Sequence, residues 1–191
     1  MIRSVKSMTI LLLALAGGLA VADEGRLRRY ELPNLDTLEL TLPSGWQDET
    51  DVPPGGIPLT IRLYPAEGIP FEVFVTPESP EPTAGEVQDT ESLREAVRDA
   101  AERIRPQAVE GSIEIRRLQG GSGSGIGFYF SATDRAPQPQ EFRHMNQGAL
   151  QAGELTLWFT ILTNDGQDAV VAEALAMLQA AVHRRTGLDQ R

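Results

Sequence analysis

The sequence predicts an α+β protein, with a largely antiparallel sheet of about six to seven strands and helices packed on it. Several segments alternate apolar and polar residues with the two-residue period of a half-buried strand, and two segments show the 3.6-residue period of an amphipathic helix. The strand-like segments are grouped, with three before the first helix and four between the helices. This order, βββ-α-ββββ-α, favours hairpins and an antiparallel sheet over parallel βαβ units.

The chain begins with a segment typical of export. Arg3 and Lys6 precede a short apolar stretch, which ends at Ala20-Val21-Ala22. A basic start, a short apolar core and a small-x-small exit are the marks of a secretory signal peptide. We therefore expect residues 1–22 to be a signal peptide that is cleaved between Ala22 and Asp23.

An uncleaved membrane anchor is the alternative to cleavage. Gly17 and Gly18 disfavour it, because they interrupt the apolar run well before the about 20 residues that a span requires. The chain contains no Cys, which excludes a lipid-modified cysteine, disulfides, zinc–thiolate sites and thiol catalysis. We expect a periplasmic protein that keeps no membrane anchor after cleavage, with secretion from the cell as the alternative.

Cleavage would leave 169 residues, a length that suits one domain with a sizeable core. Residues 23–36 are polar and rich in Arg, and we expect them to be a flexible lead-in. A single α+β domain is expected over 37–187, followed by a C-terminal tail over 188–191. The part after residue 22 carries 15 Arg and no Lys against 27 acidic residues, a formal charge of −12, which disfavours binding to nucleic acid or anionic lipid.

Three alternating segments predict strands at the start of the domain, and a helix with one apolar face follows them. The short connection between the second and third strands predicts a hairpin. The turn Pro43-Ser44-Gly45-Trp46 ends the first strand, and two Pro-rich stretches are expected to be loops outside the sheet. Thr90 is expected to cap the helix and Pro106 to end it. The expected strands are 37–42, 59–64 and 71–76, the loops 51–56 and 77–82, and the helix 91–105.

Four further strands and a second helix complete the expected domain. Gly148 is expected to break the third of these strands, and the nearly continuous apolar run of the fourth predicts a central strand covered on both faces. The last turn of the final helix is expected to hold Arg184 and Arg185, where cations favour the helix dipole. Gly187 is the expected C-cap. The expected strands are about 113–118, 126–132, 141–150 and 155–162, and the helix 168–185.

The two histidines are the first candidates for chemistry. His144 follows Glu141 in a strand-like segment and has the chemistry to join a metal site or act as a base. No second ligand stands at a useful spacing, so a structural role or a surface contact is the favoured interpretation of His144. The helix dipole accounts for His183, at the expected helix end, better than catalysis does.

Two other segments invite a chemical interpretation. Ser44 is the most tempting nucleophile for a hydrolase, but it lacks the GxSxG elbow, and its base would have to be one of two distant histidines. The Gly-rich stretch 120–127 has neither the GxGxxG spacing nor a following helix, so a hairpin loop is favoured over a phosphate cradle. The acidic residues are scattered, which fits a solvated surface better than a paired-carboxylate site.

The two tryptophans differ in their surroundings. Trp158 lies between Leu157 and Phe159, which predicts a core position. Trp46 follows a turn, and it either covers the core or forms a surface contact. The core role is favoured, and the surface contact is kept as a candidate.

The chain resembles the PsbP/DcrB-like family in the order of its expected elements. These are a strand, the turn Leu-Pro-Ser-Gly-Trp, a hairpin, a helix, antiparallel strands and a last helix. The matching stretches are 38–46, 93–104, 127–130 and 147–162, with the final helix after them. The resemblance implies an α/β/α sandwich around an antiparallel sheet. It also implies a non-enzymatic accessory role, because the family includes extrinsic photosystem subunits, exported bacterial proteins of unknown role and a nuclear-import cofactor. No catalytic residue of the family is available to transfer.

The expected function is therefore that of an exported, non-enzymatic accessory or binding protein, which acts through contacts with an unidentified protein partner in the periplasm. No catalytic residues, metal ligands or cofactor-binding residues are assigned. The alternative is a small-ligand binder or hydrolase that uses a cleft between the sheet and the Pro/Gly-rich loops. A secreted effector is the third hypothesis. A polar-lined pocket near His144 or Ser44 distinguishes the second hypothesis from the first.

Overall fold

The structure, a computed structural model, describes residues 25–32, 36–51, 59–79, 89–121 and 124–185. These residues form two antiparallel sheets and two helices, so the α+β class is confirmed. The expected signal peptide with its Ala22–Asp23 cleavage site, the loop at 52–56, Gly187 and the C-terminal tail lie outside the described residues. The elements are β1 Arg26–Glu31, β2 Thr37–Leu42, β3 Trp46–Asp51, β4 Thr60–Pro65, β5 Glu72–Glu78, α1 Thr90–Ile104, β6 Arg116–Gln119, β7 Ser124–Thr133, β8 His144–Ala152, β9 Leu155–Thr163, α2 Asp168–Gln179 and β10 Val182–Arg184.

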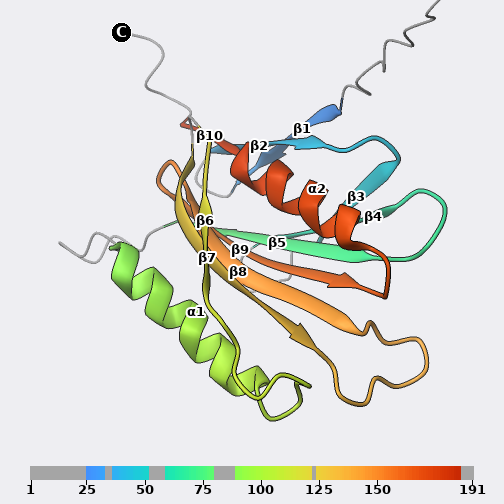
Figure 1. The fold of residues 1–191 in the computed structure, drawn as a ribbon. Coiled ribbons are helices and arrows are strands. Elements are labelled where there is room, and N and C mark those ends of the chain that lie inside the picture. The colour runs from blue at the N-terminus through green and yellow to red at the C-terminus, as the bar shows by residue number, and fades with distance from the viewer. Residues whose placement is uncertain (1–24, 33–35, 52–58, 80–88, 122–123, 186–191) are drawn as a thin grey trace, which may run out of the picture.

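The larger sheet has seven strands in the order β3-β4-β5-β9-β8-β7-β6. Strands β4 and β5 form the expected hairpin, and β9 occupies the expected central position between β5 and β8. After β5 the chain passes through α1 to the far edge of the sheet, and β6 to β9 then return as a meander (Figure 1). This path brings the end of β9 and the start of α2 close to β7 and β8.

The smaller sheet has the order β1-β2-β10, and it corrects the expected flexible lead-in. Arg26–Glu31 pairs with β2 along its whole length, and Tyr30 is buried. Asp48 on β3 explains why an Arg-rich segment is ordered. Its carboxylate accepts hydrogen bonds from Arg26 and Arg28 and from the hydroxyl of Tyr30 at 3.1 Å. The two Arg side chains therefore share one carboxylate, whose side chain is 4% exposed.

The expected long final helix is also corrected, because α2 ends at Gln179. The chain then turns at Ala180 and Ala181 and adds β10 to the edge of β2. His183 and Arg184 thus lie in a strand and not in a helical turn. Five strands precede α1 and one follows α2, so the expected order of elements is wrong at both ends.

Four local expectations also need correction. Trp46 begins β3, where a turn and a loop were expected, and β5 extends through Pro77 to Glu78. Gly148 lies inside β8 and does not interrupt it. Asp89, not Thr90, caps α1, because its side chain accepts a hydrogen bond from the backbone N–H of Ser92. The bounds of the other expected strands differ from the observed ones by only a few residues at each end.

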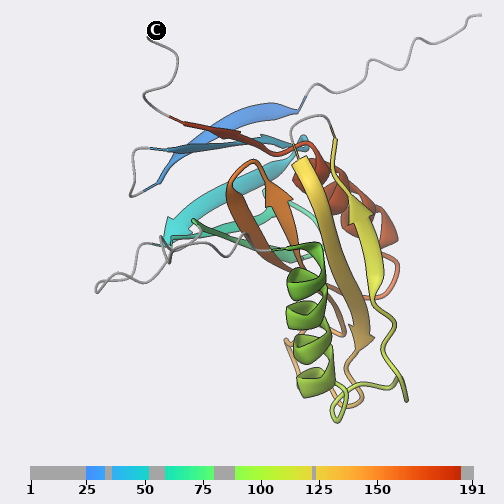
Figure 2. The ribbon, with the colours of Figure 1, turned by 90° about the vertical axis from the view of Figure 1, so that its left-hand side faces the viewer.

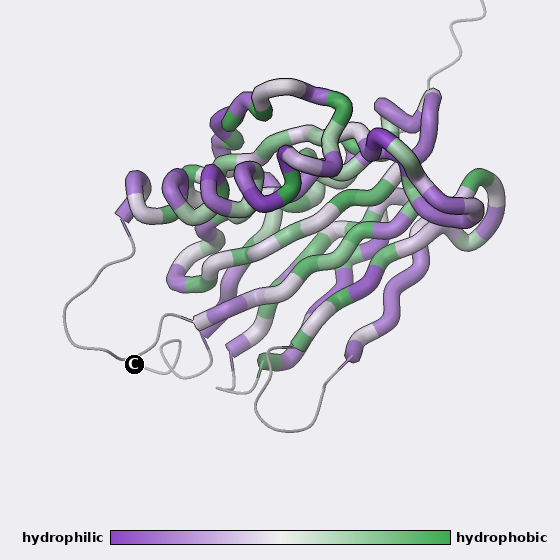
Figure 3. The backbone as a smooth tube through the Cα atoms, turned by 90° about the horizontal axis from the view of Figure 1, so that it is seen from below, coloured by the Kyte–Doolittle hydropathy of each residue, from purple (hydrophilic) through white to green (hydrophobic). Residues whose placement is uncertain are grey.

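The two faces of the large sheet bury different cores. Figures 1 and 2 place α1 on one face and α2 with the smaller sheet on the opposite face. Hydrophobic and hydrophilic residues alternate along the strands (Figure 3), as the two-residue period requires. Among the described residues, neither helix is long and apolar enough to span a membrane. The α2 side buries Leu40, Ile61, Val75, Phe159 and Leu178, and the α1 side buries Leu93, Val97, Phe128 and Phe130.

Glu39 on β2 connects the three strands of the smaller sheet. Its carboxylate accepts hydrogen bonds from Nε of Arg29 on β1 at 2.9 Å and from Nε of Arg184 on β10 at 3.1 Å. The side chain is 10% exposed. The hydrogen bond from Arg29, together with that from Arg184, outweighs the effect of burial and lowers the pKa of Glu39 below its ordinary value.

Replacing Glu39 by Gln is expected to lower the free energy of unfolding at pH 7 by about 1 kcal/mol, because one of the two oxygens that accept from Arg29 and Arg184 becomes an NH₂ donor and the other loses its negative charge. The pKa of Glu39 is lower in the folded than in the unfolded protein, so its contribution is complete above the unfolded value of about 4.3 and is lost as the pH falls through the folded value. Urea unfolding at pH 7, 5 and 3 should show the difference from wild type shrinking at low pH. A difference that stays constant with pH would contradict this role. Glu114→Gln, at an exposed ion pair of 3.7 Å, is the control and should change little.

Candidate functional site

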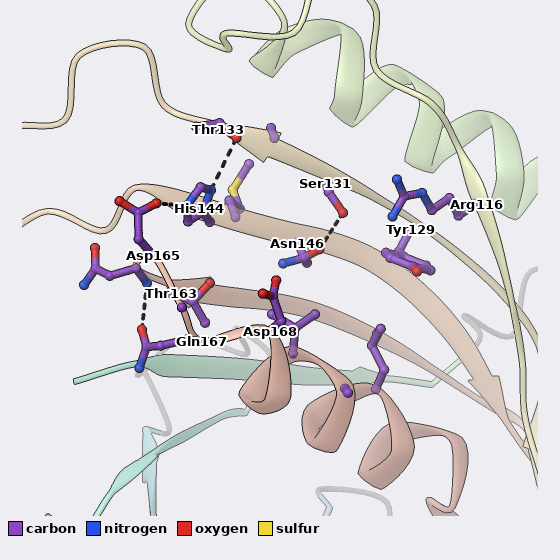
Figure 4. Close-up of a pocket in the computed structure, with 17 residues that line it drawn as sticks. Arg116, Tyr129, Ser131, Thr133, His144, Asn146, Thr163, Asp165, Gln167 and Asp168 are labelled. Atoms are coloured by element: carbon purple, nitrogen blue, oxygen red, sulfur yellow. Dashed lines mark hydrogen bonds and ion pairs between the residues drawn. The ribbon is translucent and has the colours of Figure 1, made fainter. Parts of the chain in front are cut away.

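A cleft of about 470 Å³ lies between the sheet and the first turns of α2 (Figure 4). Its volume is within the range of roughly 300–1,000 Å³ that is typical of small-ligand pockets. The β9–α2 loop closes one end of the cleft, and β6 contributes Arg116. The cleft lining includes residues of β7 (Tyr129, Ser131, Thr133), β8 (His144, Asn146), β9 (Thr163), the loop (Asp165, Gln167) and α2 (Asp168, Val171, Ala172, Leu175).

The strand pairing aligns the polar side chains of the cleft floor in two rows. Thr133 pairs with His144, and His144 pairs with Thr163 on its other side. Ser131 pairs with Asn146 in the next row of the same face. Because every second residue of a strand points to the same face, the five side chains share the α2 side of the sheet. The floor is therefore polar, whereas α2 opposes it with apolar side chains.

Asn146 is the most constrained polar residue of the floor. It is 7% exposed, and its Oδ1 accepts a hydrogen bond of 2.6 Å from the Ser131 hydroxyl. Among the described residues, no hydrogen-bond partner is found for the two N–H groups of its amide. In the described part of the chain, Asn146 Nδ2 is not one of the side-chain atoms that are both sealed from solvent and without a partner, so these N–H groups reach solvent at the cleft. These donors border the cleft, so a ligand in the cleft would satisfy them.

Asp168 is the first residue of α2 and lies on the opposite wall. A carboxylate in the first turn is stabilised by the helix dipole. Within the described ranges, no ion pair or side-chain hydrogen bond engages this carboxylate. In Figure 4 it points from the start of the helix toward the strand that carries Asn146. The cleft thus combines an amide donor on its floor with a carboxylate acceptor on its other wall.

The loop before α2 is held by Gln167, which is 6% exposed. Its Oε1 accepts a hydrogen bond from the Asn164 N–H at 2.7 Å, and its Nε2 donates to the carbonyl of Ile69 at 3.3 Å. Gly166 allows the sharp turn, because its φ of 80° is in the left-handed region. These contacts fix the position of Asp168 relative to the sheet.

His144 lies at the loop end of the cleft, between a carboxylate and a hydroxyl. Its Nε2 is 2.7 Å from Asp165 Oδ1, and its Nδ1 is 3.3 Å from Thr133 Oγ1. The hydrogen bond with His144, together with the charge of Arg143, lowers the pKa of Asp165. The imidazole is oriented by two partners and is 32% exposed. It has the chemistry to exchange a proton with a ligand in the cleft.

Glu110 adds a second carboxylate behind Thr133. Burial raises the pKa of Glu110, but hydrogen bonds from Thr133 outweigh this effect, and the nearby charge of His144 adds to them, so the pKa is lowered. The backbone N–H of Thr133 donates to Glu110 Oε2 at 2.9 Å. Thr133 is therefore held by two contacts, one from its backbone N–H to Glu110 and one from its hydroxyl to His144.

The other candidates from the sequence lie elsewhere. Trp46 is 7% exposed and its ring centroid is 4.6 Å from that of Phe71, so it is a core residue and not a surface contact. Ser44 is exposed in the turn between β2 and β3 and does not line the cleft. Trp158 is only partly buried, and its Nε1 donates to Glu78 Oε2.

His183 is buried in the smaller sheet, with its side chain 3% exposed. Its Nδ1 accepts a hydrogen bond from the Glu154 N–H at 3.2 Å, and its Nε2 lies 3.2 Å from Asp36 Oδ2. Nε2 is close to this carboxylate but does not have the geometry of a hydrogen bond with it, and it is the one buried side-chain atom of the described residues that has no hydrogen-bond partner. This histidine therefore connects β10 to the β8–β9 turn and to the start of β2.

Only His144 of the cleft was a candidate from the sequence, and Tyr129, Ser131, Asn146 and Asp168 were missed. A signal for them exists, because Tyr129 and Ser131 occupy alternate positions of a strand whose other positions are apolar. No group of three or more His, Asp or Glu side chains in the described part of the chain is arranged to hold a metal ion. The chain matches none of the protein-family models, curated proteins or solved structures with which it was compared. A functional proposal therefore depends on the residues of the cleft.

Proposed function

We propose that the protein binds a small polar molecule in the cleft between β7, β8 and α2. The observation that supports this most strongly is the amide of Asn146, a residue that is 7% exposed and whose N–H groups reach solvent at the cleft and are engaged by no described residue. A ligand in the cleft would accept hydrogen bonds from these donors in place of water. The cleft also has the volume and the mixed polar and apolar walls of a small-ligand site.

We further propose that this binding takes place after export, in the periplasm. The basic, apolar and small-residue segments of 1–22 support export. We also propose that the chain belongs to the PsbP/DcrB-like family. It is supported by an antiparallel sheet with α1 on one face and α2 on the other, the layering that the resemblance implies.

A non-enzymatic accessory role through protein contacts is the second candidate function. The observation that favours it is the α1-side face of β4 and β5, where Tyr64 and Phe74 are partly exposed and no described helix covers them. Arg62 lies over the ring of Tyr64, with Cζ 5.2 Å from its centroid. This role becomes the better proposal if no small molecule binds in the cleft.

Filling the cleft tests the first proposal. Ala172 and Ala176 are both exposed on α2, one turn apart, and only Ala172 is among the cleft residues. We expect Ala172→Trp to weaken ligand binding at least about tenfold, because the indole would occupy the cleft, and Ala176→Trp to leave it unchanged. Ligand-observed NMR with a mixture of sugars, amino acids, carboxylic acids and amines measures the effect.

Two results would contradict the proposal. The first is a ligand that binds the wild-type protein and Ala172→Trp equally well. The second is a mixture in which no compound shows binding to the wild-type protein. Equal thermal stability of the two variants would show that the loss is local to the cleft.

A further inference from the structure

The donors and acceptors of the cleft define the class of ligand more narrowly. Resting on the proposed function, we infer that the ligand is a neutral polyhydroxylated molecule, a sugar or a sugar-like polyol. The hydrogen-bonding groups along the floor are mostly uncharged hydroxyls and amides. They are those of Tyr129, Ser131, Thr133, Asn146 and Thr163.

Asn146 and Asp168 face the cleft with complementary requirements. The Oδ1 of Asn146 already accepts a hydrogen bond from Ser131, whereas both N–H donors are open to a ligand. An ionised Asp168 has only acceptors. A ligand that contacts both must accept a hydrogen bond at one point and donate one at another.

A hydroxyl group both donates and accepts, so neighbouring hydroxyls of a polyol satisfy the two residues together. An ammonium group only donates, and it would leave the N–H groups of Asn146 without a partner. A carboxylate only accepts, and it would bring a negative charge toward Asp168. The pair therefore discriminates against both charged classes.

The other charged side chains of the cleft have ion-pair partners, although the pair of Arg116 is exposed and weak. Asp165 pairs with His144 at 2.7 Å and with Arg143 at 3.6 Å. Arg116 has its Nε 3.7 Å from the Glu114 carboxylate. Within the described residues, Asp168 is thus the one cleft carboxylate that has no charged partner. A single carboxylate carries too little charge to select a multivalent ion.

The helix side of the cleft suits the carbon skeleton of a sugar. Val171 and Leu175 are partly buried on α2 and face the polar floor across the cleft. The C–H groups of a sugar ring form an apolar face that these side chains would cover. Tyr129 adds an aromatic ring whose hydroxyl is a further polar contact. A ligand with one polar and one apolar face fits both walls.

The test is a titration of the ¹⁵N-labelled protein with D-glucose and myo-inositol, and separately with putrescine and succinate. We expect the two polyols to shift the side-chain N–H resonances of Asn146, and the charged probes to leave them unchanged. Asn146→Asp keeps an oxygen for the Ser131 hydroxyl but removes the donors, and should weaken polyol binding about tenfold or more. Gln147→Glu, the same change on the opposite face of β8, should bind as the wild type does.

Asp168→Asn is the second variant, because Asp168 is exposed and its replacement does not depend on a core position. It should weaken polyol binding and remove the discrimination against succinate. Binding of putrescine or succinate in the cleft, without binding of either polyol, would overturn the inference and leave the proposed function standing. Absence of any binding in the cleft would overturn both. Polyol binding that Asn146→Asp and Asp168→Asn leave unchanged would also overturn the inference.

Discussion

Replacing Gly148 by Ala is expected to lower the free energy of unfolding by about 3 kcal/mol. Gly148 lies in β8 directly opposite Tyr129 of β7. A Cβ at this position would lie 2.6 Å from the Cβ of Tyr129 and would also collide with the backbone oxygen of Phe128. Neither atom is at the free end of a side chain, so the strands themselves would have to move apart. Both β7 and β9 pair with β8 at this point, which prevents a local adjustment.

Urea unfolding followed by circular dichroism measures the change. Gly111→Ala is the matched control, because a Cβ there would have no atom within 4 Å, and we expect its effect to stay within about 0.5 kcal/mol. Equal stabilities of Gly148→Ala and Gly111→Ala would show that β7 and β8 are not in the close contact described. The Gly148 variant should also weaken ligand binding, because Tyr129 borders the cleft.

Gly148 also shows what a strand pattern in a sequence leaves open. The sequence predicts a break at this position, because Gly weakens a strand. In the structure the same residue permits the close approach of a neighbouring backbone, which is the other physical reason for Gly in a strand. Only the identity of the opposing residue decides between the two, and that residue lies on another strand.

Strands β1 and β10 of the smaller sheet could not be predicted, for a related reason, whereas β2 was. Most strands of the large sheet and helix α1 show strong local periodicity, and the sequence predicts them within a few residues. Strand β1 instead contains three exposed Arg residues, and its order depends on Asp48, which is about 20 residues away. The Asp48 carboxylate raises the pKa of Arg28 through a hydrogen bond and its charge. Such partners are visible only after the chain has folded.

Strand β10 was hidden by helix propensity. The Ala-rich end of α2 favours continuation of the helix, and two Arg residues suit a helical C-terminus. The chain instead ends the helix at Gln179, and Arg184 pairs with Glu39 from β2. A tertiary ion pair together with edge pairing to β2 thus outweighs a local preference.

The candidate site was predicted only in part, because it combines residues from four segments. His144 attracts attention by its chemistry alone, whereas Asn146 is ordinary in sequence. Its significance comes from burial, from the hydrogen bond with Ser131 and from the position of Asp168 across the cleft. The connection from β9 to α2, fixed by Gln167, is what brings Asp168 there.

A second large effect is expected on the opposite face of the sheet, where Phe130→Ala should lower the free energy of unfolding by about 4 kcal/mol. Phe130 is fully buried between β7 and α1, in the cluster that contains Leu93 and Val97. Removal of its ring would leave a cavity under the helix. We expect the amides of α1 to lose protection from hydrogen exchange by more than those of β4 and β5 do, because α1 packs mainly on this part of the sheet.

Phe74→Ala is the control, because it removes an aromatic ring from the same face of the sheet at a position that α1 does not cover. Strand pairing places Phe74 in the same row as Phe130, through Thr160 and Gln147, so the two rings share one face of the sheet. Phe74 is only partly buried, and no described helix lies over it, so its truncation should cost less than half as much. A cost equal to that of Phe130→Ala would mean that another part of the chain covers this face. It would also remove the observation that favours a protein-contact role, because Phe74 would then no longer be part of an open surface.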